Sequence, residues 1–96
     1  MTNIGDIFIE VYQVVEDRKK NPKSGAYTSY LLEKGQDKIC KKVVEEATEL
    51  VLAAKNQDKE QAVRELADLY YHLMVLMVQE NITWEEIAAE MKNRRT

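Results

Sequence analysis

The sequence lacks the features that would place the protein in an oxidising compartment or in a membrane. It has a single cysteine, Cys40, among 96 residues, so an intramolecular disulfide is excluded. No apolar run approaches the ~20 residues that span a bilayer. The N-terminal segment places acids among its apolar residues and has no positively charged start, unlike a secretory signal peptide. We therefore expect a cytoplasmic protein without a membrane partner, in which Cys40 is a small buried hydrophobic residue.

An excess of positive charge is also absent. The formal net charge is −3, whereas proteins that bind nucleic acid or anionic membranes usually carry a basic excess or a basic stripe. We therefore expect no nucleic-acid partner.

Proline and glycine, which break helices, are rare. Pro22 is the only proline, and it lies with Gly25 in residues 21–27, which we expect to be the longest irregular segment. Elsewhere apolar residues recur at spacings of three and four, which predicts helices, and the period-two alternation of strands is absent. The predicted helices cover residues 4–20, 28–32, 37–56, 58–80 and 83–94. The expected fold class is all-α, with residues 1–96 as one domain and amphipathic helices forming a four-helix-bundle-like core.

The predicted helix boundaries follow from residues that cap helices. Thr28, Asp37, Asp58 and Thr83 are the expected N-caps, because their side-chain oxygens can accept a hydrogen bond from a backbone N–H of the first turn. Gly35 is placed to end the second helix. A chain this short buries less of its surface than a larger domain does. We therefore expect homodimerisation to complete the core.

Acidic residues interrupt the apolar stripes of the two longest predicted helices. At about 100° per residue, Glu46 falls within the stripe and Glu49 lies about 60° away, at its edge. Glu65 and Asp68 repeat this arrangement on the next helix. If the two helices pack antiparallel across their short connection, the four carboxylates converge. An ionised carboxylate held against apolar surface is costly without a partner.

A cation would neutralise such a cluster. Converging acids repel one another and tend to protonate, and Mg²⁺ takes carboxylate ligands while it keeps waters for substrate phosphates. A di-iron site would instead call for Glu-x-x-His motifs, and the second motif here is Glu-x-x-Asp, from Glu65 to Asp68. The same spacing also occurs on solvated helix faces, where Glu45 would pair with Lys38, Lys41 or Lys42. Spacing alone leaves both interpretations open.

Basic residues and one histidine lie close to these acids in the sequence. Lys34, Lys38 and Lys42 are either solvated or placed to bind a polyphosphate, whose charge a metal alone does not neutralise. His72, the only histidine, is either a satisfied core residue or a group that orients Asp68 or touches phosphate.

The arrangement of acids resembles a known family. Glu45-Glu46-x-x-Glu49 followed by Glu65-x-x-Asp68 is similar to the EExxE and ExxD pattern of the all-α nucleotide pyrophosphatase superfamily. The stretches AYTSYLLEKGQDKICKKVVEEATELVLAAK and ELADLYYHLMVLM resemble the phosphoribosyl-ATP pyrophosphatase family over most of the chain. The chain departs from this family at Ala26, where members often have serine, and at Val44, where they often have glycine. Neither departure touches the carboxylates.

The resemblance implies a cytoplasmic, homodimeric, nucleotide-binding hydrolase of histidine biosynthesis. Such an enzyme hydrolyses phosphoribosyl-ATP between its α and β phosphates, with Mg²⁺, to phosphoribosyl-AMP and pyrophosphate. The implied Mg²⁺ ligands are Glu46, Glu49, Glu65 and Asp68. The expected catalytic residues are Glu45, Glu46 and Glu49, and Glu45 would orient the attacking water or a further ion. The implied polyphosphate-binding residues are Lys38 and Lys42, with Lys34 beside them.

Two alternatives stay open. One is a house-cleaning pyrophosphatase of the same superfamily that acts on non-canonical nucleoside triphosphates. The other is a non-enzymatic helical dimerisation module whose acids form only a solvated face.

Overall fold

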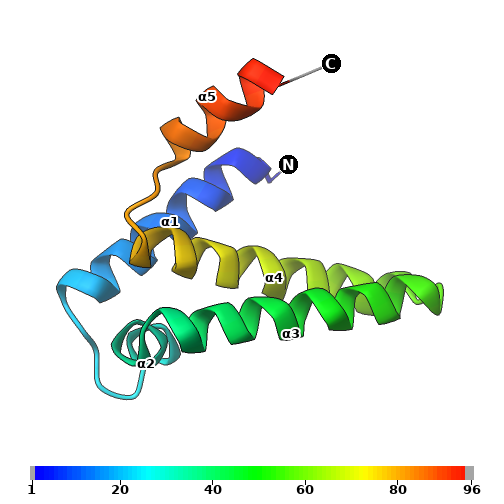
Figure 1. Ribbon diagram of the computed structural model, residues 1–96, viewed down its shortest axis with the longest axis horizontal. Coiled ribbons are helices and arrows are strands. Elements are labelled where there is room, and N and C mark those ends of the chain that lie inside the picture. Colours follow the sequence, from blue (N-terminus) through cyan, green and yellow to red (C-terminus); the bar gives the residue numbers. More distant parts are fainter. Residues whose placement is uncertain (1, 95–96) are drawn as a thin grey trace.

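The computed structural model describes residues 2–94 and folds them into helices alone (Figure 1). In chain order the helices are α1 (Ile4–Lys20), α2 (Tyr27–Lys34), α3 (Gln36–Lys55), α4 (Lys59–Gln79) and α5 (Trp84–Arg94). No strand is found within residues 2–94, which confirms the all-α fold class. Among the described helices, none is both long and apolar enough to cross a membrane.

The two longest helices, α3 and α4, lie side by side and antiparallel, joined by a short turn (Figure 1). Asp58 caps α4 as predicted, because its side chain accepts a hydrogen bond from the Gln61 backbone N–H at 3.1 Å. Thr83 and Glu86 cap α5 reciprocally. The Glu86 N–H donates to Thr83 Oγ1 at 3.2 Å, and the Thr83 N–H donates to Glu86 Oε1 at 2.9 Å.

Two predicted caps are wrong. Helix α2 begins at Tyr27, so Thr28 lies inside it, and its hydroxyl is hydrogen-bonded to the Tyr71 hydroxyl of α4. The residue before α2 is Ala26, which offers no side-chain cap. Gly35, as expected, ends α2, but its φ of 93° turns the chain so sharply that α3 starts at Gln36 and includes Asp37 in its first turn.

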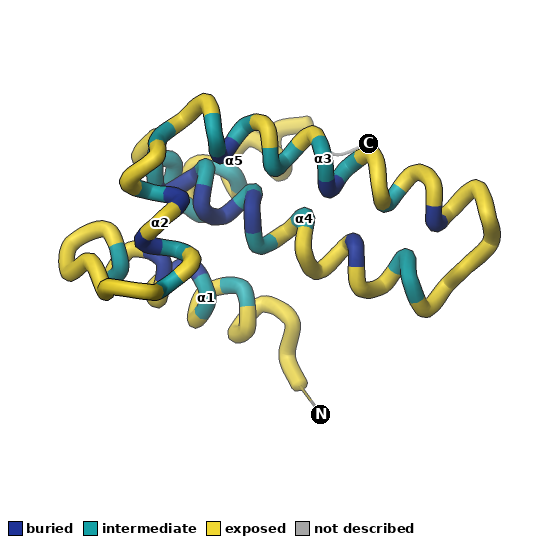
Figure 2. The backbone as a smooth tube through the Cα atoms, turned by 90° about the horizontal axis from the view of Figure 1, so that it is seen from below, coloured by how far each residue is buried: buried dark blue, intermediate teal, exposed yellow. Residues whose placement is uncertain are grey.

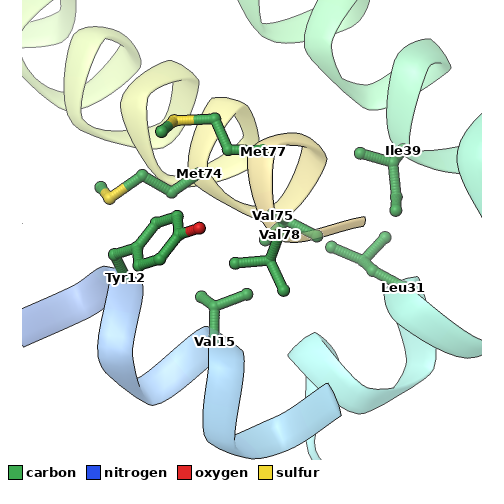
Figure 3. Close-up of a cluster of buried hydrophobic side chains, with 8 residues drawn as sticks. All are labelled: Tyr12, Val15, Leu31, Ile39, Met74, Val75, Met77 and Val78. Atoms are coloured by element: carbon green, nitrogen blue, oxygen red, sulfur yellow. The ribbon is translucent and has the colours of Figure 1, made fainter. Parts of the chain in front are cut away.

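The hydrophobic core lies at one end of the α3–α4 pair, where α1 and α2 pack against α4. Figure 3 shows its buried side chains, which come from α1, α2, the start of α3 and the second half of α4: Tyr12, Val15, Leu31, Ile39, Met74, Val75, Met77 and Val78. Trp84 and Ile87 of α5 pack against this cluster. Cys40 is a free thiol and is only half-buried, so it is less enclosed than expected. The core therefore leaves the far half of α3 and α4 without a covering helix.

Candidate active site

Three acids meet where α3 faces α4. One carboxylate oxygen from each of Glu46, Glu49 and Glu65 lies within 4.8 Å of the other two. Glu46 and Glu65 are buried, with 7% and 6% of their surface exposed, and Glu49 is exposed. The predicted places of these residues, two within the apolar stripes and one at an edge, are confirmed. The antiparallel packing of α3 on α4 creates this cluster.

Asp68, the fourth acid of the predicted set, does not join this cluster. It is exposed, and it lies about one helical turn beyond Glu65 on α4. The structure thus brings together three of the four acids whose convergence the spacing predicted.

In each of the two buried acids, Glu46 and Glu65, one carboxylate oxygen lies near a polar group and the other does not. Glu65 Oε1 accepts a hydrogen bond from Gln61 Nε2 at 2.6 Å, and Glu46 Oε1 lies 3.7 Å from Lys42 Nζ. Among the described residues, neither Glu46 Oε2 nor Glu65 Oε2 has a hydrogen-bond partner, although both atoms are buried. Buried polar atoms are almost always paired in folded proteins. Two unpaired carboxylate oxygens on facing helices are therefore a place for a ligand that carries positive charge.

The electrostatics of the cluster point the same way. The hydrogen bond that a protonated Glu49 carboxyl would donate to Glu65, together with the negative charges of Glu46 and Glu65, raises the pKa of Glu49 to about 7. A carboxyl group behaves in this way when nearby acids are not neutralised. A hard divalent cation with oxygen ligands supplies the missing charge. The donor set of three carboxylates fits Mg²⁺.

The three predicted phosphate-binding lysines differ in their contacts. Lys42 lies against the acids, with its Nζ atom 3.4 Å from Glu45 Oε2. Burial lowers the pKa of Lys42, but Tyr27, Glu45 and Glu46 together raise it by more, so the pKa lies above its ordinary value. Lys34 extends over the ring of Tyr30, with its Nζ atom 5.8 Å from the ring centroid. Lys38 is half-buried and makes no ion pair within the described residues. Lys42 alone of the three contacts the candidate site.

His72 is buried, and both of its ring nitrogens have partners. Nδ1 lies 2.7 Å from the backbone carbonyl oxygen of Asp68, and Nε2 lies 3.0 Å from the Tyr27 hydroxyl. A carbonyl oxygen only accepts, so Nδ1 carries the proton and, in the neutral ring, Nε2 accepts a hydrogen bond from Tyr27. His72 is thus a satisfied core histidine, and its contact with Asp68 is through the backbone and not the carboxylate.

Two residues of the site were not singled out from the sequence. Gln61 holds Glu65 by a hydrogen bond, and its position one turn earlier on the same face of α4 could have indicated this. Tyr27 contacts His72 across 45 positions of sequence. No local pattern could have indicated that contact, because it depends on how α2 packs against α4.

The open side of the cluster is a hollow next to the α3–α4 turn. It has a volume of about 410 Å³, and Glu49 and Glu65 line it together with Gln61 and residues of the turn. A hollow of this size admits a metal ion with its waters and phosphate groups. Two of the three acids, Glu49 and Glu65, therefore face a hollow that is open to solution.

The chain is similar in sequence to a known protein family and to several of its members. Residues 8–95 match the family described as "Phosphoribosyl-ATP pyrophosphohydrolase". The chain is 47% identical over 93 residues to a phosphoribosyl-ATP pyrophosphatase of Clostridium botulinum (strain Hall), a match that covers 97% of this chain and 84% of the relative. It is 50% identical over 95 residues to the corresponding protein of Clostridium novyi, with 99% and 86% covered. It is 53% identical over 89 residues to the histidine biosynthesis bifunctional protein HisIE of Caldanaerobacter subterraneus, with 93% of this chain but 43% of that protein covered.

Proposed function

The chain belongs to the phosphoribosyl-ATP pyrophosphohydrolase family, and we propose that the carboxylates of α3 and α4 carry out this family's reaction with Mg²⁺. As a member of this family, it is a hydrolase that acts on phosphoribosyl-ATP in histidine biosynthesis. The observation that carries the site assignment is the pair of buried, unpaired oxygens, Glu46 Oε2 and Glu65 Oε2, on facing helices.

In the proposed reaction, water attacks between the α and β phosphates of phosphoribosyl-ATP. One phosphoanhydride bond breaks, and the products are phosphoribosyl-AMP and pyrophosphate. Mg²⁺, when bound, neutralises the acids and the developing charge on the phosphates. Glu46, Glu49 and Glu65 are the proposed ligands on the basis of their 4.8 Å cluster. Asp68 is proposed as a further ligand on the basis of the ExxD pattern, because it lies outside that cluster.

The remaining charged residues have proposed roles toward the water and the phosphates. Glu45 is half-buried beside the cluster, where it can accept a hydrogen bond from the attacking water. Lys42, now paired with Glu45 and Glu46, would exchange these partners for phosphate oxygens. Lys38 lies one helical turn before Lys42 on α3, and Lys34 is the last residue of α2. Both would add positive charge for the polyphosphate.

We also propose that the protein is a cytoplasmic homodimer. Several apolar side chains on the outer faces of α3 and α4 are more than half exposed: Val44, Val51, Leu52 and Val63. A set of this kind is typical of an interaction surface, and a second copy of the chain would cover it. The free thiol of Cys40 is consistent with a reducing compartment.

The test is release of pyrophosphate from phosphoribosyl-ATP in the presence of Mg²⁺ or of EDTA. We expect turnover with Mg²⁺ and none with EDTA. A panel of standard and non-canonical nucleoside triphosphates is assayed in parallel. Faster turnover of a triphosphate than of phosphoribosyl-ATP would instead indicate a house-cleaning enzyme. No turnover, with no Mg²⁺ binding by calorimetry, would indicate a non-enzymatic helical module.

A further inference from the structure

A second hollow lies at the start of α2, and two tyrosines line it. Tyr27 and Tyr30 lie about one turn apart on α2, and their rings stack with centroids 6.3 Å apart and planes 24° apart. With the turn of residues 22–26, Ser29 and Glu33, they line a hollow of about 570 Å³. This volume is in the range of small-molecule binding sites. Both tyrosines are nearly half exposed, at 46% and 43% of their surface.

Tyr27 is held in place although it is exposed. Its hydroxyl donates to His72 Nε2 at 3.0 Å, and the edge of one ring meets the other with centroids 5.8 Å apart. On another side its ring stacks against Tyr71 of α4. An exposed aromatic ring that is fixed in this way loses little conformational entropy when a ligand binds to it.

The turn that forms the other wall is also fixed. The backbone N–H of Lys23 donates to Ser29 Oγ at 2.9 Å, and Ser29 is buried. This hydrogen bond ties the turn to α2. The hollow is therefore formed before any ligand arrives.

Tyr27 connects this hollow with the face of α4 that carries Glu65. It lines the hollow, and its hydroxyl bonds to His72, which lies about two turns after Glu65 on the same face of α4. Burial raises the pKa of Tyr27, and the nearby charges of Lys42 and Glu46 act on that pKa in opposite directions. Lys42 in turn contacts Glu46. A ligand whose phosphates lie against Lys42 would thus have its remaining part next to Tyr27.

We propose that this hollow binds the adenine ring of the substrate, which stacks on the rings of Tyr27 and Tyr30. The inference rests on the proposed function, which places the triphosphate at Lys42 and the acids. Aromatic side chains bind the flat faces of purines by stacking. The hollow has one lysine, Lys23, and one glutamate, Glu33, in its lining, so it has no excess of positive charge that would select a second phosphate.

The first experiment measures steady-state kinetics of phosphoribosyl-ATP hydrolysis in variants of Tyr30. Tyr30→Ala removes a stacking surface, and we expect KM to rise about tenfold with kcat largely unchanged. Tyr30→Phe keeps the ring, and its KM should stay close to that of the parent. Tyr70→Ala is the matched control, because Tyr70 is equally exposed at 44% but its ring packs at a tilt of 52° against Phe8 of α1, away from the hollow. An unchanged KM in Tyr30→Ala, or an equal rise in Tyr70→Ala, would overturn the proposal.

The second experiment does not depend on turnover. Calorimetry compares the binding of ATP with that of inorganic tripolyphosphate, which has no base. The parent, Tyr30→Phe and Tyr70→Ala should prefer ATP by about tenfold, and Tyr30→Ala should lose this preference. A preference that survives in Tyr30→Ala, or its absence in the parent, contradicts base binding in the hollow. Failure of the proposed function would be seen separately, as no hydrolysis of phosphoribosyl-ATP by the parent.

Discussion

The two ends of the α3–α4 pair share the same apolar stripes, but one end buries apolar side chains and the other buries carboxylates. At the end near α1 and α2, Ile39 and Val75 are fully buried among apolar side chains. About two turns farther along α3, Glu46 occupies the same stripe and is 7% exposed. In Figure 2 the buried positions crowd together where α1 and α2 meet α4 and are isolated along the rest of the pair. Burial alone therefore does not distinguish a core position from a site position in this chain.

The difference lies in what the buried atoms need. A buried apolar side chain is stabilised by leaving water, at roughly 25 cal/mol per Å². A buried carboxylate has the opposite requirement, because it must replace its lost hydration with hydrogen bonds or with a cation. The core end meets its requirement within the chain. The acidic end leaves one oxygen on each of Glu46 and Glu65 without a partner among the described residues, so these residues do not meet its requirement.

The largest expected effect comes from removing a charge at the acidic end. Glu46→Gln keeps the size of the side chain but removes a charge that Mg²⁺ needs, so kcat should fall by roughly a thousandfold. In EDTA the variant should be at least as stable as the parent, because one repelling charge is gone. Pyrophosphate release and thermal melting measure the two effects. Glu60→Gln is the control, since Glu60 is an exposed acid of α4 paired with Arg64. Near-normal activity in Glu46→Gln would contradict the metal assignment.

Addition of Mg²⁺ should stabilise the acidic end specifically. A ligand at a hundred times its Kd raises the free energy of unfolding by about 2.7 kcal/mol when it binds only the folded state. The melting temperature of the parent should therefore rise with Mg²⁺, and that of Glu46→Gln should rise less. Equal shifts in both proteins would show that the ion acts elsewhere on the chain.

The core end should respond to truncation and not to the ion. Val15 is 1% exposed, and Val15→Ala should lower the free energy of unfolding by about 1–2 kcal/mol through lost apolar contact and a small cavity. Its kcat, measured below the melting temperature, should match that of the parent. Val14→Ala is a matched control on the same helix, because Val14 is 46% exposed and its loss should have little effect. A larger loss of stability in Val14→Ala would reverse this assignment.

The smallest effect is a pH dependence that belongs to the acidic end. The pKa of Glu49 in the folded protein, about 7, is above the ordinary value of 4.5, so the folded state binds the extra proton between these two values. The stabilisation from this group is present below pH 4.5 and is lost as the pH rises through 7. In EDTA, the melting temperature of the parent should therefore fall more between pH 5 and pH 8 than that of Glu49→Gln. An identical pH dependence in both proteins would show that Glu49 does not titrate in this range.

The sequence alone determined what depends on the helical period and on nearby residues. A residue's place on its helix follows from a rotation of about 100° per residue, so the buried positions of Glu46 and Glu65 could be predicted without the partner helix. The caps at Asp58 and Thr83 were also predictable, because each is a hydrogen bond between residues three positions apart.

Only the tertiary structure decided which groups meet across helices. The register and rotation of α3 against α4 bring Glu65 to Glu46 and Glu49 but leave Asp68 outside. Thr28 was wrongly predicted as a cap, because α2 begins at Tyr27, and the Thr28 hydroxyl bonds instead to Tyr71 of α4. Tyr27 likewise contacts His72 of α4. These contacts join residues more than forty positions apart. Such contacts depend on the packing of side chains between helices, which no periodic pattern within a single helix specifies.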